Sequence, residues 1–424
     1  MAERWDTIII GGGQAGLAMS YYLQQHERKH VVLERARIAE RWRTERWDSL
    51  RFQFINQSIE LPGLSYQDPE PEGFAHYTAI SRFIEDYAAK IAAPVRQGVE
   101  VRRLWRRDAG DYALDTSAGS MTARHVVVAT GPFQRSMIPA AARDLPRSVY
   151  QVHASKYCGP DELPRGAVLV VGSGASGSQI ADELQQSGRN VFLSVSPHRR
   201  VPRRYRGKDV LWWFDKMGRF EITIDSFPER RFPPSTVVTG VNGGYDMNVR
   251  RFARDGGTVL GRVLGCANGM LSIADDAAQI LAEADKSYDD FVSAAETWAE
   301  KPENSDHIRD SDEHSVTPIL AEIGDARSVD IAGENVSSVI WGTGYLFDYN
   351  WMDLPIFDAR GAPAQQRGVT AFPGLYFLGL HWMHAFGSGL LSYVGRDAAY
   401  IARHMEALGS EALGSPAPLS WSPA

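Results

Sequence analysis

Two glycine patterns with identical spacing are the residues of this chain best suited to chemistry. In each, glycines stand at the first, third and sixth positions, after a short apolar run and before an apolar stretch of helical length. The glycines are Gly11, Gly13 and Gly16 in the first pattern and Gly172, Gly174 and Gly177 in the second. Such a turn lets a pyrophosphate approach backbone N–H groups, and the following helix N-terminus favours negative charge. We therefore predict two dinucleotide sites, with further contacts from the first helical turns at Gln14, Ala15 and Ser176.

An acidic residue follows the first pattern at the distance that ribose recognition needs. Glu34 closes the apolar run Val31–Leu33 and lies 23 residues past Gly11. Its carboxylate can accept hydrogen bonds from both ribose hydroxyls, and Arg35 beside it joins the predicted site. The alternative is a glycine turn without a ligand.

The second pattern lacks this acid. Ser194 stands at the aligned strand end, followed by Ser196, so nothing there repels a 2′-phosphate. Five arginines then fall within residues 199–206. Guanidinium groups suit phosphate, and we predict that Arg199 and Arg200 clamp the 2′-phosphate of NADPH in preference to NADH. The alternative is a solvated basic loop.

The elements around the two patterns predict an α/β fold with two Rossmann-like dinucleotide-binding domains, the second inserted into the first. The sequence around each pattern predicts a strand, a turn, a helix and a second strand, which together form a βαβ unit. Prolines around residues 135–165 mark the first boundary. We assign residues 1–148 and 329–424, which include a C-terminal helix, to the first domain. Residues 149–328 form the second domain, with an insertion at about 215–325.

Composition limits the class of protein. The 424 residues carry 45 Lys and Arg against 52 Asp and Glu, a net charge of −7, which argues against nucleic acid as a partner. The two cysteines, Cys158 and Cys266, provide no CxxC pair and no zinc site. The start shows no signal peptide and no run is long enough to span a membrane, so we expect a cytoplasmic protein.

Two dinucleotide units, the first ending in an acid and the second in arginines, resemble the two-dinucleotide-binding-domain flavoproteins and, within these, the class B flavin-containing monooxygenases. The family's linker fingerprint, Phe-x-Gly-x-x-x-His-x-x-x-Phe/Tyr, is matched by His153 and Tyr157, whereas Arg147 and Val149 replace its Phe and Gly. The resemblance covers nearly all of the chain outside 215–325. It implies FAD at the first pattern and NADPH at the second, with contacts from later strand ends at Thr130, Gly131, Gly342, Thr343 and Gly344.

The resemblance also implies residues beside the flavin. Trp42 keeps the tryptophan of a family segment whose glycines are absent here, and would form a flavin-side wall. Gln53 stands where the family has an asparagine near the flavin, and is the candidate catalytic residue; an ordinary strand residue is the alternative. Gly387 and Ser388 would open an apolar helix aimed at the flavin. His381 and His384 lack a third ligand, so we expect cavity lining and no metal site.

The function implied by the resemblance is that of an NADPH-dependent flavin monooxygenase. Hydride would pass from NADPH to FAD, and dioxygen would give a hydroperoxyflavin that donates one oxygen atom to an amine nitrogen or a thioether sulfur. The partners would be a small organic substrate and dioxygen, and an insertion of this length could supply a homodimer contact. A Baeyer–Villiger oxygenase, an NADPH:quinone-type reductase and a non-catalytic flavin-binding protein are the alternatives.

Overall fold

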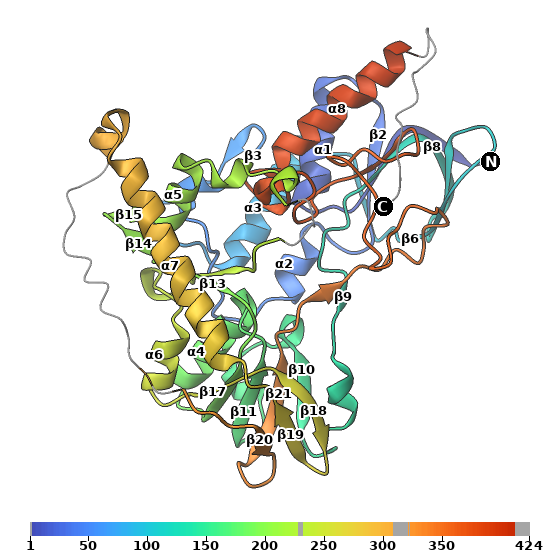
Figure 1. The fold of residues 1–424 in the computed structure, drawn as a ribbon. Helices are drawn as coiled ribbons and strands as arrows, with labels where there is room; N and C mark the ends of the chain where they lie inside the picture. The colour runs from blue at the N-terminus through green and yellow to red at the C-terminus, as the bar shows by residue number, and fades with distance from the viewer. Residues whose placement is uncertain (1, 228–231, 308–320, 322, 412–424) are drawn as a thin grey trace.

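The computed structural model describes residues 2–227, 232–307, 321 and 323–411, and its strands form two main sheets (Figure 1). The first sheet has seven strands in the order β5-β2-β1-β8-β7-β6, with β23 also paired to β8. Its strands are β1 (Glu3–Ile10), β2 (His30–Glu34), β5 (Val95–Gln97), β6 (Val101–Arg106), β7 (Tyr112–Thr116), β8 (Gly119–Val128) and β23 (Leu375–Phe377). The pairs among β5, β2, β1, β8 and β23 are parallel, and β6 and β7 add an antiparallel edge.

Apolar runs explain this sheet and the helices on it. The carboxyl-terminal halves of β1 and β8 are buried without alternation, as expected of parallel strands covered on both faces. The helices are α1 (Gln14–Gln25), α3 (Tyr77–Lys90) and α8 (Val394–Glu411), and α8 lies beside α1 (Figure 1). Helix α8 buries an apolar stripe at the spacing of one helical face: Val394, Ala398, Ile401, Ala402 and Met405.

The second sheet is wholly parallel, in the order β10-β21-β11-β12-β17. Its strands are β10 (Tyr150–His153), β21 (Val336–Trp341), β11 (Ala167–Val171), β12 (Val191–Ser194) and β17 (Thr258–Leu260). Alternate residues of β11 pack on opposite faces: Val168 and Val170 in one core cluster, Leu169 and Val171 in another. Helices cover the first face: α4 (Ala175–Gln186), α6 (Val249–Arg254) and α7 (Ala277–Ala299). A three-stranded antiparallel sheet covers the second: β18 (Val263–Ala267), β19 (Met270–Ile273) and β20 (Ser328–Asp330).

Short elements connect these layers. They are the helices α2 (Glu40–Thr44) and α5 (Val210–Lys216), the 3-10 turns η5 (Arg219–Glu221) and η9 (Phe386–Gly389), and the strands β3 (Glu60–Leu61), β4 (Leu64–Ser65), β9 (Arg135–Ser136), β13 (Arg199–Arg200), β14 (Arg204–Tyr205), β15 (Lys208–Asp209), β16 (Thr236–Val237) and β22 (Tyr345–Leu346). Antiparallel pairing of β22 with β9 places the two connections between the sheets side by side.

The predicted α/β fold with two Rossmann-like units is confirmed, but the second domain boundary lies later than predicted. Strand β21 falls within 329–424, which we assigned to the first domain, yet it pairs with β10 and β11 in the second sheet. The segment 215–325 is also more than an insertion, because β17 completes the second sheet and α7 covers it. Within the described ranges, no helix combines the length and the apolar character that crossing a bilayer requires.

Candidate active site

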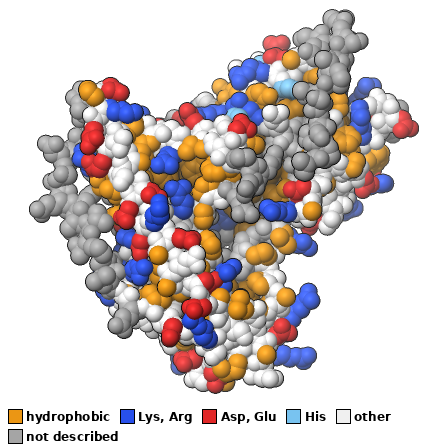
Figure 2. Space-filling view, in the orientation of Figure 1, with side chains coloured by type: hydrophobic (Ala, Val, Ile, Leu, Met, Phe, Trp, Pro, Cys, Tyr) orange, Lys and Arg blue, Asp and Glu red, His pale blue; other side chains and the backbone are white. Residues whose placement is uncertain are grey.

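A cavity of about 1540 Å³ lies where strands of both sheets end. Residues just past the carboxyl ends of β1, β2, β8 and β23 line it from the first sheet, and residues past β11, β12, β17 and β21 line it from the second. Figure 2 shows the surface hollowed between the parts of the molecule that carry the two sheets. The carboxyl ends of parallel strands are where open α/β sheets bind their ligands.

The first glycine loop has the backbone geometry that only glycine provides. Gly11 has a φ of +115°, and a Cβ there would lie 2.5 Å from the carbonyl oxygen of Ala129. A Cβ on Gly16 would lie 1.9 Å from the carbonyl oxygen of Gly11. Gly13, in contrast, has open space around it and is the N-cap of α1, where no side chain caps the helix. The uncapped N–H groups of α1 therefore face the cavity, ready for an anion.

The second glycine loop repeats this geometry. Gly172 has a φ of +103°, and a Cβ there would lie 2.5 Å from the carbonyl oxygen of Gly342. A Cβ on Gly177 would lie 1.8 Å from the carbonyl oxygen of Gly172. Gly174 has open space and begins α4 without a side-chain cap. Ser176, Thr343 and Gly344 line the cavity beside this loop.

Glu34 reaches the first loop as the sequence predicts. Its Oε2 accepts a hydrogen bond from the Gly12 N–H at 2.7 Å, and its Oε1 accepts one from the Ala36 N–H at 2.9 Å. These two bonds hold the carboxylate at the cavity wall. The remaining predicted contacts of this site also line the cavity: Gln14, Ala15, Arg35, Trp42, Thr130 and Gly131.

Ser194 and Ser196, at the end of β12, form hydrogen bonds with the backbone of neighbouring loops. The Ser194 hydroxyl donates to the Gly261 carbonyl at 2.9 Å and accepts from the Val263 N–H at 3.2 Å. The Ser196 hydroxyl accepts from the Ser173 N–H at 3.1 Å. Both serines line the cavity, and their uncharged hydroxyls are already engaged in hydrogen bonds.

Arg199 and Arg200 lie outside the cavity lining, which does not fit the predicted phosphate clamp. The chain turns away after Ser196 and forms β13, which packs against α7. There Arg200 pairs with Asp285 through Nη1 and Oδ1 at 2.7 Å, and its guanidinium lies 4.3 Å from the centre of the Tyr288 ring.

Arg262 is a lining arginine beside the second glycine loop that the sequence did not predict. It follows β17, lines the cavity near Ser194 and Val263, and pairs with Asp276. Because β17 lies more than 60 residues past β12, only the pairing of these strands brings Arg262 to the dinucleotide loop. No local sequence signal marks it.

Gln14, Trp42 and Gln53 line the cavity on the side of the first glycine loop. Trp42 donates from Nε1 to Gln14 Oε1 at 3.4 Å, and Gln14 donates from Nε2 to the Gly389 carbonyl at 3.4 Å. Gln53 lines the cavity from a bend and not from a strand, and its carbonyl accepts from Arg203 Nη2 at 2.8 Å. The Gln53 backbone is thus fixed at the cavity wall.

The helix predicted to open at Gly387 does not begin there. Phe386–Gly389 form a single 3-10 turn, Leu390 is extended, and α8 starts only at Val394. Gly387 and Ser388 are buried behind the lining, where the Ser388 hydroxyl accepts from the Ala385 N–H at 3.0 Å. An extended Leu390 ends the helical geometry, so no long helix dipole points from Gly387 into the cavity.

The linker histidine is held in place by backbone contacts. One ring nitrogen of His153 lies 3.0 Å from the carbonyl oxygen of Gly344, and the other lies 2.9 Å from the Ser155 hydroxyl. Burial lowers the pKa of this imidazole. Tyr157 is buried and donates to Glu183 at 2.7 Å, so the second half of the fingerprint ties the linker to α4.

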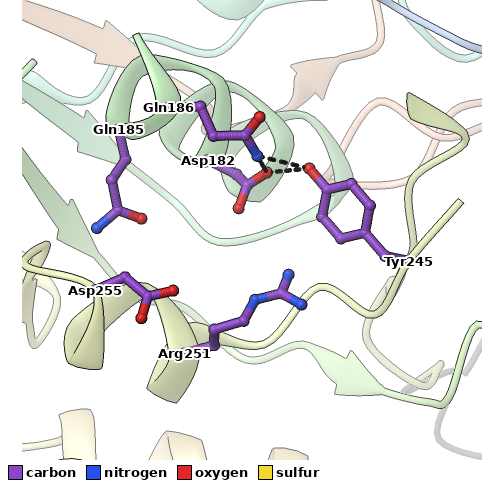
Figure 3. Close-up of a pocket in the computed structure, with 6 residues that line it drawn as sticks. All are labelled: Asp182, Gln185, Gln186, Tyr245, Arg251 and Asp255. Atoms are coloured by element: carbon purple, nitrogen blue, oxygen red, sulfur yellow. Dashed lines mark hydrogen bonds between the residues drawn. The ribbon is translucent and has the colours of Figure 1, made fainter. Parts of the chain in front are cut away.

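A second, smaller pocket of about 440 Å³ lies between α4 and α6 (Figure 3). The Tyr245 hydroxyl donates to Asp182 there, and Gln186 Nε2 contacts the same hydroxyl at 2.9 Å. Burial raises the pKa of Asp182 and raises that of Tyr245 to about 12. Arg251 and Asp255 close the other side. None of these residues lines the large cavity, and their contacts with one another join the helices.

Comparison with known proteins agrees with this geometry. An uncharacterized CzcO-like oxidoreductase of Geobacillus kaustophilus is 34% identical over 402 residues, which cover 93% of this chain and 97% of that protein. The chain belongs to the CzcO-like oxidoreductases. A family described as pyridine nucleotide-disulphide oxidoreductase also matches residues 8–210 of this CzcO-like chain.

Solved structures share the fold along nearly the whole chain. A flavin-containing monooxygenase of Stenotrophomonas maltophilia superposes with a TM-score of 0.66 at 18% identity, covering 96% of this chain and 99% of that one. OTEMO in complex with FAD and NADP superposes with a TM-score of 0.57 at 14% identity, covering 97% and 87%. The expected resemblance of this CzcO-like oxidoreductase to two-domain flavin monooxygenases is therefore confirmed in its fold.

Proposed function

We propose that the protein is an FAD- and NADPH-dependent monooxygenase that transfers one atom of dioxygen to an amine nitrogen or a thioether sulfur. The observation that supports this most is that two glycine-lined helix N-termini, those of α1 and α4, open on one cavity without side-chain caps. Two dinucleotide sites that share a cavity allow a nicotinamide to meet a flavin.

The residues around the first loop fit FAD. Gly13 leaves room for a pyrophosphate to approach the backbone, and the N–H groups at the start of α1 would bind it. Glu34 would accept hydrogen bonds from the ribose of the adenosine half. Trp42 and Gln14 would hold the other end of the cofactor, because their side chains meet at the cavity wall.

The residues around the second loop fit a nicotinamide dinucleotide. Gly174 and the start of α4 repeat the arrangement of the first loop. Residues 194–197 supply no acid that would repel a 2′-phosphate, and Arg262 supplies a positive charge on the same wall. This combination favours NADPH over NADH, by a route different from the clamp predicted from sequence.

Bound together, the two cofactors would supply the redox chemistry, in which a thioether, dioxygen, NADPH and a proton give a sulfoxide, NADP⁺ and water. The chain itself needs to bind, orient and exclude water. Gln53 would orient a bound group through its amide, which can both donate and accept hydrogen bonds. Cys158 and Cys266 are absent from the cavity lining, so a dithiol reaction of the disulfide-reductase kind has no residues there.

Oxygen consumption by the purified, FAD-loaded protein tests this function. With NADPH and a panel of amines and sulfides, we expect one panel member to gain an atom from isotopically labelled dioxygen and to suppress peroxide release. If a quinone accelerates NADPH oxidation and no oxygenated product forms, the protein is a reductase and not a monooxygenase. If NADPH does not bleach the bound flavin under anaerobic conditions, both enzyme interpretations are wrong.

A further inference from the structure

Trp382 has a backbone conformation that a bulky side chain rarely adopts. Its φ is +53°, in the left-handed region, and its side chain lines the cavity. Gly389 packs closely against the residue that precedes Trp382, since a Cβ at Gly389 would lie 2.6 Å from the His381 ring. Such strain persists where surrounding structure enforces it, and it concentrates at ligand sites.

Trp382 is part of a continuous group of aromatic rings. The Trp382 and Phe386 ring centres lie 5.2 Å apart, and Phe386 stacks on Phe220 at 5.6 Å. Phe220 in turn stacks on Phe54 at 6.0 Å, and Phe54 on Phe52 at 5.4 Å. We call this part of the cavity, with its six lining rings, the aromatic end: Phe52, Phe54, Phe214, Phe220, Trp382 and Phe386.

The aromatic end adjoins the flavin side of the cavity. The ring centres of Phe52 and Trp42 lie 5.6 Å apart, and Trp42 bonds to Gln14 in the first glycine loop. Gln53 lies between Phe52 and Phe54 in the chain and lines the same cavity. A molecule stacked among these rings would therefore lie next to Gln53 and the first dinucleotide loop.

Most charged side chains of the lining lie outside the aromatic end, with Arg51 at its border beside Phe52. The lining acids and arginines come from residues 34–51, 100–102, 262 and 348. Among the described residues of 210–220 and 379–391 that line the cavity, none is an acid, a lysine or an arginine. The position of His381 in the cavity lowers the pKa of its imidazole, which disfavours a positive charge there. The stacked rings and neutral lining match a flat, uncharged ligand.

We propose that the aromatic end binds the aryl group of a neutral aryl thioether, and that Trp382, whose ring packs on Phe232 and Phe386 at the cavity wall, determines this specificity. Oxygenation of that substrate rests on the proposed function, whereas its binding does not. Not every aromatic residue near the cavity belongs to the aromatic end, as the consecutive residues Trp212, Trp213 and Phe214 show. Trp213 is buried in the core and Trp212 packs on it, and only Phe214 lines the cavity.

Equilibrium dialysis of the FAD-loaded protein without NADPH tests the site. The probes are methyl phenyl sulfide, its 4-carboxylate analogue and dimethyl sulfide. We expect the aryl sulfide to bind and to shift the visible spectrum of the bound flavin. The carboxylate should bind at least about tenfold more weakly, because the lining residues of 210–220 and 379–391 include no lysine or arginine to pair with its charge. Dimethyl sulfide should also bind more weakly, because it has no ring to stack.

The Trp382→Gly and Phe220→Leu variants test the residues. Each should weaken binding of the aryl sulfide by about three- to tenfold, the contribution of one aromatic contact. Glycine adopts a φ of +53° without strain, so Trp382→Gly should keep its fold and its flavin. The matched control is Trp212→Phe, which changes a tryptophan outside the cavity lining and should leave binding unchanged.

Three results would overturn the site: no binding of the aryl sulfide, equal binding of its carboxylate, or unchanged binding in both variants. If the aryl sulfide binds with the expected dependence on Trp382 but NADPH and dioxygen never convert it to the sulfoxide, the site stands and the proposed function fails. The dialysis and the turnover assay therefore separate the two proposals.

Discussion

Arg262 and Arg200 differ in where their guanidinium groups lie, and this decides which of them can recognise a phosphate. Arg262 lines the cavity wall, with a side chain 61% exposed, whereas Arg200 is 14% exposed and occupied by Asp285. An added 2′-phosphate can share Arg262 with Asp276, but it cannot reach Arg200 without breaking the contact between β13 and α7.

We predict that Arg262→Ala raises the KM for NADPH by about tenfold and changes the KM for NADH little, because one charge-assisted hydrogen bond to phosphate is lost. Steady-state oxidation of NADPH and of NADH measures the two KM values and their ratio. Arg200→Ala is the matched control, and should leave the NADPH to NADH ratio unchanged. If the ratio of the KM values for NADPH and NADH changes in Arg200→Ala and not in Arg262→Ala, the phosphate clamp predicted from the sequence is correct.

The third glycine of each loop offers a second residue-scale test. A Cβ on Gly16 would lie 1.9 Å from a backbone oxygen in the first loop, and a Cβ on Gly177 would lie 1.8 Å from one in the second. We predict that Gly16→Ala releases flavin, whereas Gly177→Ala keeps flavin and raises the KM for NADPH. Each costs about 1–3 kcal/mol of overpacking at its own loop.

Flavin content after gel filtration and NADPH kinetics measure these two outcomes. Gly188→Ala lies at a positive φ of +82° with nothing within 4 Å of its Cβ, and serves as a control for backbone strain without a clash. Flavin loss in Gly177→Ala, or its retention in Gly16→Ala, would contradict the assignment of the two loops.

Residues that act through local spacing were predictable from the sequence, and those brought in by tertiary pairing were not. The glycines and Glu34 act within one βαβ unit of about thirty residues, so the sequence alone locates them. Arg262 reaches the same wall only because β17 pairs with β12. Trp382 carries no signal at all, because its importance lies in a φ angle that its neighbours impose.

At the scale of elements, a buried ion pair joins the second domain to the Gln53 segment. Arg203 and Asp209 are 1% and 5% exposed and lie 2.6 Å apart. Asp209 also caps α5 by accepting from the Leu211 N–H, and Arg203 donates to the Gln53 carbonyl. The connection between β14 and α5 is thus fixed against the wall of the cavity.

We predict that Arg203→Met lowers the free energy of unfolding by about 3–5 kcal/mol, because it leaves the Asp209 carboxylate buried without its partner. Adding Asp209→Asn should recover part of the loss, since asparagine removes the charge and still caps a helix. Urea denaturation measures both. A double variant as unstable as Arg203→Met would mean that the hydrogen bond to Gln53, and not the buried charge, carries the energy.

Elements with their own periodicity were predictable, and their ends were not. The sequence around Tyr288–Ala299 predicts a helix, and this helix is the second half of α7, which begins earlier, at Ala277. The helix expected from Gly387 begins at Val394, because residues 386–389 close a 3-10 turn stabilised by Ser388. Gly387 and Gly389, which predicted the start of a helix, instead allow the 3-10 turn to pack closely against its neighbours.

At the scale of the whole molecule, strand order decides how the chain is divided. The two βαβ units were predictable because each is local, but β21 joins β11 across more than 160 residues. The pairing of β17 with β12 likewise places this strand, from within 215–325, in the second domain. Helix α7 also contacts the first domain, since its residues Phe291 and Ala295 lie in the core cluster that contains β1 and β8. The cavity therefore depends on both sheets being folded.

Acid should destabilise this arrangement through His125, which lies on β8 at the centre of the first sheet. His125 is 5% exposed, and burial lowers its pKa from the ordinary value to about 4. Between about pH 6.5 and 4 the unfolded chain therefore binds a proton that the folded chain does not, so stability falls as pH falls through this window. From pH 7 to pH 5 we predict a loss of about 2 kcal/mol from this residue.

His125→Phe removes the titrating group and keeps a buried ring, so it should flatten the dependence of unfolding free energy on pH by that amount. Urea denaturation with excess FAD at pH 7 and pH 5 measures the difference. His76→Phe provides the control, because that imidazole bonds to Thr78 and the Asp48 carbonyl in an exposed setting. Because β8 pairs with both β1 and β23 beside the first glycine loop, the loss in the wild-type chain should appear together with release of flavin. An unchanged pH dependence in His125→Phe would place the acid sensitivity elsewhere in the molecule.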